Sequence, residues 1–314
     1  MSESAILTVG LAKHYGDLVA VEGLDLAVAS GDIFGLVGPD GAGKTTVIRT
    51  LTGVTAPTAG HAAVLGHDVV GEAERLRSEV GYMAQRFTLY RDLTVMENLS
   101  FFADVFGVPT EERIGRIARL LAFAKLSRFK DRLGGQLSGG MQKKLALACT
   151  LVHRPKVVFL DEPTTGVDPV SRREFWEILT DLHLQGTTIF VSTPYMDEAE
   201  RCSRVGLLYQ GRLIVCDTPE RIRAMAGGAM LEVRAEDVRR ARAAVAGVAG
   251  VRDVQAYGDR LHVLVDDADA RAGAVGAAVA AAGIAVASVR STRPRMEEAF
   301  IALIKARSTR EDDR

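Results

Sequence analysis

A glycine-rich segment between an apolar run and a helix-forming stretch places the strongest constraint on how this chain folds. The sequence from Ile33 to Thr46 reads IFGLVGPDGAGKTT. The spacing G-x-x-x-x-G-K-[ST] is matched by Gly38, Gly43, Lys44 and Thr45. Glycines let backbone N–H groups converge on phosphate oxygens, and the N-terminus of the following helix adds a favourable partial charge. The segment therefore predicts a phosphate-binding loop; a glycine-rich turn without a ligand is the alternative.

Two acidic residues end a second apolar run and supply the partner that such a loop needs. The run VVFL at 157–160 is followed by Asp161 and Glu162. A carboxylate at the end of a buried parallel strand lies in the crevice where α/β proteins bind ligands. We expect Asp161 to hold Mg²⁺ with the Thr45 hydroxyl, and Lys44 to reach the terminal phosphates. Glu162 is placed to orient or deprotonate an attacking water. The alternative is that both acids cap the next helix.

Short apolar runs alternate with amphipathic stretches up to about residue 225, a pattern typical of buried parallel strands in an α/β protein. Strands are predicted at 33–38, 80–85, 157–161, 187–192 and 205–210. The runs at 6–9 and 19–28 alternate more strictly and predict antiparallel edge structure. Helical periodicity dominates from Leu93 to Val152. We therefore predict a mostly helical subdomain inserted in the α/β core.

A second domain is expected after a change of composition at 226–230, where AGGAM is typical of a linker. The order strand, helix, strand, strand, helix, strand follows, with a turn at Gly258 and Asp259 between the middle strands. This order is that of the split-βαβ, ferredoxin-like α+β arrangement. One apolar face of a last helix is formed by Met296, Ala299, Phe300 and Leu303. We place this domain at 230–305.

Five motifs in combination resemble those of the ATP-binding cassette (ABC) ATPases over residues 5–225: GPDGAGKTT, YMAQ, LSGGMQ, FLDEPTTGVDP and STPYMDEAE. The resemblance implies an α/β P-loop NTPase cassette at 1–225, with its helical subdomain at about 87–152. It also implies an ATPase that uses ATP and Mg²⁺. The residues implied to bind ATP are Tyr15, Gly38, Pro39, Asp40, Gly41, Ala42, Gly43, Lys44, Thr45 and Thr46. Tyr15 would stack on adenine, although a lone tyrosine is more often a packing residue.

The resemblance also implies two cassettes clamped head to tail around two ATP molecules. The motif that contacts the ATP of the other cassette would be Leu137, Ser138, Gly139, Gly140, Met141 and Gln142. Ser138 is expected to cap a helix running to about Val152, and a helix N-terminus favours an anion. Asp168 would shape the dimer contact. Gln85 would touch Mg²⁺ and the attacking water. The implied catalytic residues are Lys44, Gln85 and Glu162, and the implied metal-binding residues are Thr45, Gln85 and Asp161.

Two positions depart from the family pattern. Asp40 stands where asparagine is usual, which adds negative charge near the phosphates although the side-chain oxygen can bond the same loop. Pro194 stands where the family has a histidine that contacts the γ-phosphate. Proline has no N–H to donate. We therefore predict that hydrolysis at this chain's own ATP site is impaired, even though Glu162 is present.

The stretches TVMENLSFFADVFGVP and YMDEAERC, with the C-terminal RPRMEEAFIALI, are similar to cassettes of the ABC-2 type exporter group. The resemblance implies an ATPase that drives export of a drug, lipid or similar substrate through separate membrane subunits (a permease). It would pair with a second cassette as a homo- or heterodimer. We expect a cytoplasmic protein held peripherally at the inner face of the cell membrane. The apolar run closest to a membrane span, 274–287, is short of the ~20 residues required.

Composition bears on the alternatives. The net charge of −1 argues against nucleic acid as the main partner, since such proteins are usually clearly basic. Three cysteines without a CxxC motif predict buried thiols in a reducing compartment. One alternative is a soluble ABC ATPase of translation or DNA repair, although such proteins usually carry a second cassette or a long coiled coil. A nucleotide-binding regulatory cassette with little turnover is the other alternative, and Pro194 is its support.

Overall fold

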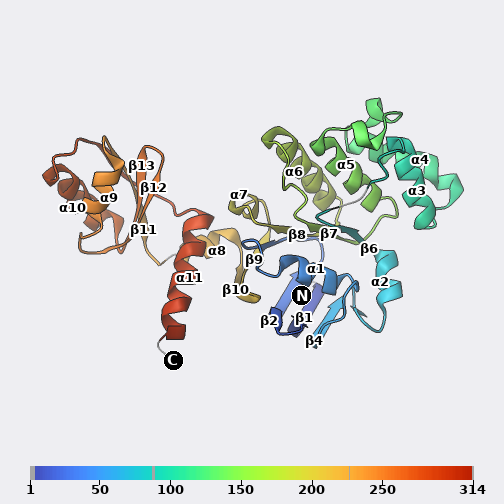
Figure 1. Ribbon diagram of the computed structural model, residues 1–314, viewed down its shortest axis with the longest axis horizontal. Helices are drawn as coiled ribbons and strands as arrows, with labels where there is room; N and C mark the ends of the chain where they lie inside the picture. The colour runs from blue at the N-terminus through green and yellow to red at the C-terminus, as the bar shows by residue number, and fades with distance from the viewer. Residues whose placement is uncertain (1–3, 87–88, 226, 313–314) are drawn as a thin grey trace. The chain divides into compact units, whose positions relative to one another are not determined.

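In the computed structural model, which describes residues 4–86, 89–225 and 227–312, the chain divides into two units (Figure 1). The units are Met1–Thr218 and Pro219–Arg314. Helix α8 (Pro219–Ala224), which precedes the predicted domain limit at 225, is part of the second unit. Residues 87 and 88, where the predicted helical subdomain starts, lie outside the described residues.

A six-stranded sheet forms the centre of the first unit. Its order is β10 (Arg212–Asp217), β9 (Arg204–Tyr209), β3 (Ile33–Val37), β8 (Thr188–Thr193), β7 (Val157–Asp161) and β6 (Val80–Met83). All neighbours are parallel except β10, which pairs antiparallel with β9 at one edge. Every residue of β3, β7 and β8 is buried, which explains their continuous apolar sequences. The five predicted parallel strands are confirmed.

A second, antiparallel sheet of the same unit has the order β2 (Leu18–Ala29), β1 (Ser4–Tyr15), β4 (Ala59–Val64), β5 (His67–Asp68). The prediction of antiparallel structure for the first two runs is confirmed; β4 and β5 were not predicted. One apolar cluster joins this sheet, helix α1 (Lys44–Leu51) and the parallel sheet, through side chains such as Ile6, Leu51 and Phe34. Helix α1 is therefore held by apolar contacts to both sheets.

The region between β6 and β7 is helical, as predicted. It contains α3 (Val95–Val105), α4 (Thr110–Phe123) and α5 (Gly139–Thr150), with single turns at Ser127–Phe129 and Gly134–Gln136. Helix α3 begins with a capping box in which Thr94 and Glu97 exchange hydrogen bonds. The unit also contains α2 (Ala73–Glu79), α6 (Pro169–Leu184) and α7 (Met196–Ala199).

The second unit has the predicted ferredoxin-like order. It runs β11 (Ala229–Ala235), α9 (Val238–Val245), β12 (Val251–Tyr257), β13 (Arg260–Val265), α10 (Ala268–Ala281) and β14 (Val286–Thr292), then α11 (Met296–Asp312). The sheet order is β12-β13-β11-β14, with all pairs antiparallel. Apolar side chains of the sheet form one buried cluster with those of α9 and α10, and Val263, Val245 and Val275 are among its members. Among the described residues, no helix combines the length and the apolar character that crossing a membrane requires.

Candidate functional site

The glycine-rich loop joins the end of β3 to the start of α1, and two of its glycines stand where a side chain cannot fit. A Cβ on Gly38 would lie 2.2 Å from the Leu208 carbonyl oxygen. A Cβ on Gly43 would lie 2.4 Å from the Ala20 carbonyl oxygen, and Gly43 has a φ of +105°, in the left-handed region. The loop therefore runs close to the backbone of two neighbouring strands, a path that requires glycine.

Lys44, the first residue of α1, turns its side chain back into this loop. Its ammonium donates to the carbonyl oxygens of Gly38 at 2.8 Å and Pro39 at 3.0 Å. It also forms an ion pair of 3.0 Å with Glu162, and both side chains are buried. A buried charge needs such pairing, because burial without a partner is costly. The pair joins the loop to the end of β7.

The carboxyl group of Asp161, the last residue of β7, accepts two hydrogen bonds. The Thr45 hydroxyl donates at 3.1 Å and the Ser192 hydroxyl, from β8, at 2.7 Å. Burial raises the pKa of Asp161, and these two hydrogen bonds oppose the shift. The predicted pair Thr45 and Asp161 therefore lies together at the carboxyl edge of the parallel sheet, where β3, β7 and β8 end.

Glu162 follows with a left-handed backbone, at a φ of +47°. This turn brings its carboxyl group to the Lys44 ammonium and to the side chain of Gln85, whose amide donates at 2.8 Å. The Thr165 hydroxyl donates to the same oxygen at 3.3 Å. A non-glycine residue in this backbone region costs on the order of 1–3 kcal/mol, and such strain is frequent at functional sites.

A cavity of about 370 Å³ lies over the loop. It is lined by side chains and backbone of Tyr15, Leu18, Val19, Ala20, Asp40, Gly41, Ala42, Gly43, Lys44, Thr45, Thr46, Gln85 and Glu162. The side chain of Tyr15 is 45% exposed, and the Lys13 ammonium lies 5.1 Å from the centre of its ring. The structure therefore places Tyr15, the loop, Gln85 and Glu162 around one open space.

The LSGGMQ residues lie elsewhere. Ser138 caps α5 by accepting from the Met141 N–H at 3.3 Å, as predicted. Gly139 and Gln142 line a second cavity, also about 370 Å³, which reaches Gln85 and Lys143. Neither cavity is lined by the other described members of the motif, which are Leu137, Ser138, Gly140 and Met141. Within the described residues of one chain, this motif therefore does not share the cavity of the phosphate loop.

Asp168 and Gly140 adjoin the start of α6. Asp168 caps this helix by accepting from the N–H groups of Val170 at 3.1 Å and Ser171 at 2.9 Å. The hydrogen bonds from Ser171 are the main cause that lowers the pKa of Asp168. A Cβ on Gly140 would lie 2.4 Å from the Ser171 hydroxyl, so glycine permits close approach of α5 to α6.

Pro194 lies directly after β8, next to the loop. The N–H of Gly38 donates to the carbonyl oxygen of Thr193 at 3.3 Å, which holds the end of β8 against the loop. Position 194 is therefore near the loop, and the proline ring offers no donor there.

A buried carboxyl group close to Pro194 was missed by sequence reasoning. Glu198, on α7, is 1% exposed and accepts from the hydroxyls of Thr164 at 2.7 Å and Thr193 at 2.6 Å. The guanidinium of Arg172 lies 3.7 Å from the same carboxyl group. Glu198 sits in the charged stretch MDEAE, in which no pattern distinguishes the one buried acid.

Sequence reasoning also missed Lys143. It follows the LSGGMQ motif directly and its ammonium donates to the carbonyl oxygen of Gln85 at 3.0 Å. Burial lowers the pKa of Lys143, and the charges of Asp161 and Glu162 oppose the shift. This hydrogen bond connects helix α5 to Gln85, whose side chain in turn donates to Glu162.

A P-loop between a parallel strand and a helix, with carboxylates at the next strand end and a helical insertion, defines an α/β P-loop NTPase of the ABC cassette type. The family model described as ABC transporter matches residues 21–165. A daunorubicin resistance ATP-binding protein of Streptomyces coeruleorubidus is 37% identical over 96% of this chain and 96% of its own length. This chain belongs to the ATP-binding proteins of the ABC transporter family.

Other relatives are also ATP-binding proteins of ABC transporters. A probable multidrug ABC transporter ATP-binding protein of Escherichia coli is 41% identical over 99% of this chain. The chain spans only 54% of that relative's length. Among solved structures, cbiO1 from Clostridium perfringens, a part of the ABC transporter complex cbiONQ, matches with a TM-score of 0.66 and 27% identity, covering 71% of this chain and 92% of that one. A dimeric cassette bound to ADP and Pi matches with a TM-score of 0.62 and 25% identity, covering 68% and 98%.

Proposed function

We propose that this chain is the ATP-hydrolysing subunit of an exporter, with its ATP site formed by the loop at 38–46. The observation that carries the proposal is the convergence of Lys44, Gln85 and Glu162 on the cavity over the loop, with Thr45 and Asp161 in contact beside them. The cassette would occupy 1–225 and an accessory domain 230–305.

The donor groups suit a nucleotide with Mg²⁺. Thr45, Asp161 and Gln85 supply hydroxyl, carboxylate and amide oxygens, which are the ligands that Mg²⁺ prefers. When bound, Mg²⁺ neutralises charge that develops on the phosphates. Lys44 would bind the terminal phosphates as an ammonium, and this requires it to exchange its bond to Glu162 for phosphate oxygens. Glu162, once released, can accept a proton from the attacking water while Gln85 orients that water.

The residues from Leu137 to Gln142 would act on the ATP of a second cassette, and Asp168 would lie at that contact. Their separation from the loop cavity supports this assignment, because none of these residues is among the described residues that line the cavity over the loop of the same chain. Tyr15 would stack on adenine at the cavity rim. The second cassette would be a copy of this chain in a homodimer or a different chain in a heterodimer.

We further propose that hydrolysis at this site is slow because Pro194 replaces a donor. A regulatory cassette with little turnover is the second candidate function, and the same proline supports it. ATP turnover of the purified chain is compared with Pro194→His and with Glu162→Gln. An impaired exporter ATPase gives measurable turnover that rises in Pro194→His and is lost in Glu162→Gln. Turnover unaffected by Pro194→His contradicts the proposed impairment, and turnover unaffected by Glu162→Gln contradicts the site.

The partners follow from the names of the relatives, which include multidrug, daunorubicin resistance and Nod factor export ATP-binding proteins. We propose that this chain likewise acts with a membrane permease, at the inner face of the cell membrane, on a drug, lipid or similar substrate. Purification of the chain with its genomic neighbours tests this. Recovery of a polytopic membrane protein with ATPase activity that responds to it is the expected result, and recovery of the chain alone from membranes that contain those neighbours contradicts it.

A further inference from the structure

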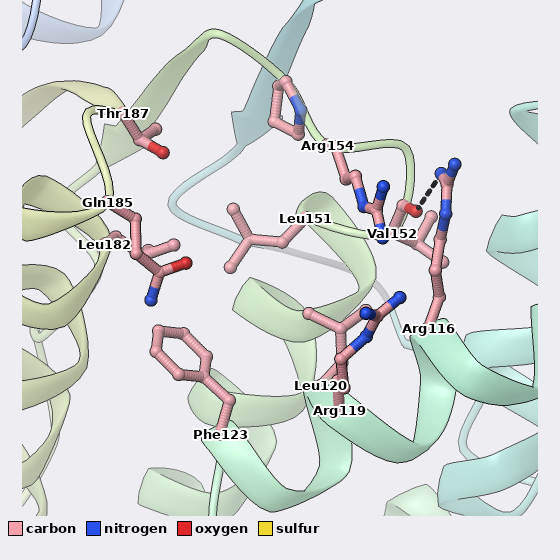
Figure 2. A pocket seen from close by; sticks show the side chains of 11 residues that line it. Arg116, Arg119, Leu120, Phe123, Leu151, Val152, Arg154, Leu182, Gln185 and Thr187 are labelled. Carbon is pink, nitrogen blue, oxygen red and sulfur yellow. Dashed lines mark hydrogen bonds between the residues drawn. The ribbon is translucent and has the colours of Figure 1, made fainter.

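A cavity of about 560 Å³ lies away from the ATP site, between α4 and the segments that precede β7 and β8. Figure 2 shows its lining side chains. Helix α4 contributes one face, at positions 116, 119, 120 and 123, which repeat with helical spacing. The other walls come from 151–155, after α5, and from 182–187, at the end of α6. Since β7 and β8 begin here, the cavity is at the opposite edge of the parallel sheet from the phosphate loop.

Three guanidinium groups border this cavity on one side. Figure 2 shows Arg116, Arg119 and Arg154 opposite the polar side chains of Gln185 and Thr187. Arg116 is fixed in place, because its guanidinium donates to Glu112 at 3.1 Å and to the Val152 carbonyl oxygen at 3.2 Å. A preoriented guanidinium loses less side-chain entropy when it binds an anion.

Arg119 and Arg154 differ from Arg116 in how their guanidinium groups are engaged. Both are exposed, and no hydrogen bond or ion pair engages either guanidinium within the described parts of the chain, 4–86, 89–225 and 227–312. The pKa of Glu112 is lowered first by its hydrogen bond from Arg116 and to a smaller degree by the charges of Arg154 and Arg119. All three arginines therefore act on one small region, and among the described residues the one ion pair that they form joins Arg116 to Glu112.

The floor of the cavity is apolar. Leu151 and Leu182 are buried, and Leu120 and Phe123 are partly buried. In Figure 2 the side chain of Leu151 lies between the arginine side and Gln185, and the ring of Phe123 lies below Gln185. The volume is within the range of about 300–1,000 Å³ that small-molecule sites have. Such a site suits a ligand with an apolar body and a charged group at one end.

We propose that this cavity binds a small organic phosphate monoester with an apolar or aromatic body. A phosphate monoester carries about −1.5 to −2 charges near neutral pH, which matches the two arginine charges left without a carboxylate. Its three oxygens accept from planar guanidinium groups in paired geometry. The apolar body lies on Phe123 and Leu151. The ligand joins α4 of the helical region to the end of α6, and neither element contributes to the cavity over the phosphate loop.

The test is isothermal titration calorimetry of the full chain with 1-naphthyl phosphate. Saturating ADP is present so that the phosphate loop is occupied. Inorganic phosphate and 1-naphthol are titrated separately, as the charged and the apolar part alone. Vesicles containing phosphatidic acid are the fourth titrant, because a lipid headgroup presents the same chemistry from a membrane. The variant is the double substitution Arg119→Gln and Arg154→Gln, and the matched control is Arg128→Gln, another exposed arginine of the helical region.

The expected result is saturable 1:1 binding of 1-naphthyl phosphate. Each component alone binds at least about tenfold more weakly, and the double variant loses at least about tenfold, since one charge-assisted hydrogen bond is worth that factor. Arg128→Gln binds as the wild type does. The proposal is overturned by absence of saturable binding, by equal binding of inorganic phosphate, by an unchanged double variant, or by binding to the vesicles only. The double variant changes exposed side chains, and its urea midpoint confirms folding independently of the titration.

Discussion

Glu198 provides the sharpest test of how the end of β8 is held beside the loop. Its carboxyl group is 1% exposed and accepts from two threonine hydroxyls, one on the β7–α6 connection and one on β8. The substitution Glu198→Leu keeps a side chain of similar size and removes both acceptors. Each buried hydroxyl left without its partner costs about 1–3 kcal/mol. We therefore expect the free energy of unfolding of the first unit to fall by about 2–6 kcal/mol.

The lower part of this range is the firmer expectation, because the Thr193 hydroxyl also accepts from the Tyr195 N–H at 3.1 Å and so retains one bond. Glu198→Gln keeps an oxygen acceptor, and its amide can donate to a hydroxyl that rotates. We expect it to cost about 1 kcal/mol, the net worth of one hydrogen bond. Glu177→Leu is the control: its carboxyl group is 50% exposed and pairs with Lys125 and Arg173, and exposed pairs contribute about 0–1 kcal/mol.

Urea unfolding followed by tryptophan fluorescence measures these differences. Trp176 is the only tryptophan of the chain and is buried in the first unit, so its signal reports that unit. The reasoning fails if Glu198→Leu lies within about 0.5 kcal/mol of the wild type, the ordinary range for surface changes. It also fails if Glu198→Gln lowers the free energy of unfolding as much as Glu198→Leu does, because the loss would then come from the change of shape and not from lost hydrogen bonds.

Two further predictions concern the loop and its carboxylates. Since burial raises the pKa of Asp161, folding favours its protonated form, and the stability that this group contributes is present below its unfolded pKa of 3.8 and lost as the pH rises through the folded pKa. Asp161→Asn should therefore be more stable than the metal-free wild type to urea at pH 7, with a difference that shrinks as the pH approaches 4; a constant difference refutes the assignment. Gly38→Ala places a Cβ 2.2 Å from the Leu208 oxygen and should cost about 1–3 kcal/mol, whereas Gly139→Ala, which meets no atom within 4 Å, should cost less than 1 kcal/mol in the same urea assay.

The sequence was sufficient to predict those parts of the site that depend on local order. A few consecutive residues were enough to predict the glycine loop, the carboxylates at the end of β7 and the Ser138 cap, because each of these short patterns is typical of one local structure. The antiparallel strands β4 and β5 were missed, because AGHAAV and the two-residue β5 carry few β-branched residues and no clear alternation. β4 pairs with β1, which is distant in sequence, and β5 in turn pairs with β4.

Other features depend on tertiary convergence and could not be predicted. Glu198 is buried because β7 and β8 end side by side, a fact that the charged stretch MDEAE does not contain. The three arginines of the 560 Å³ cavity come from α4 and from the turn after α5, and each alone has the sequence context of a solvated surface residue. Glu162 is predictable as a strand-end acid, whereas its left-handed backbone is not, because glutamate rarely adopts it.

Charge balance at the ATP site leads to a last prediction. Lys44 pairs with Glu162, and Asp161 adds a second carboxylate beside Thr45, while the charges of Lys143 and Arg49 also act on these carboxylates before any phosphate binds. Asp40, in the cavity lining, adds another negative group where the family has asparagine. The Asp40 carboxylate therefore repels the nucleotide phosphates, and a divalent cation offsets that repulsion.

The substitution Asp40→Asn removes this charge and keeps a side-chain oxygen that can bond the loop. Because Asp40 is exposed, the repulsion removed is about 0.2–1 kcal/mol, the range of exposed charge pairs, so the affinity for ATP with Mg²⁺ should rise by about 1.5- to 5-fold. The gain should be largest at about 0.01 M salt and small at about 1 M, where the Debye length falls from about 30 to about 3 Å. Fluorescence titration with a labelled ATP analogue at both salt concentrations measures it. An unchanged affinity at low salt, or a gain that does not depend on salt, would show that Asp40 does not act through its charge.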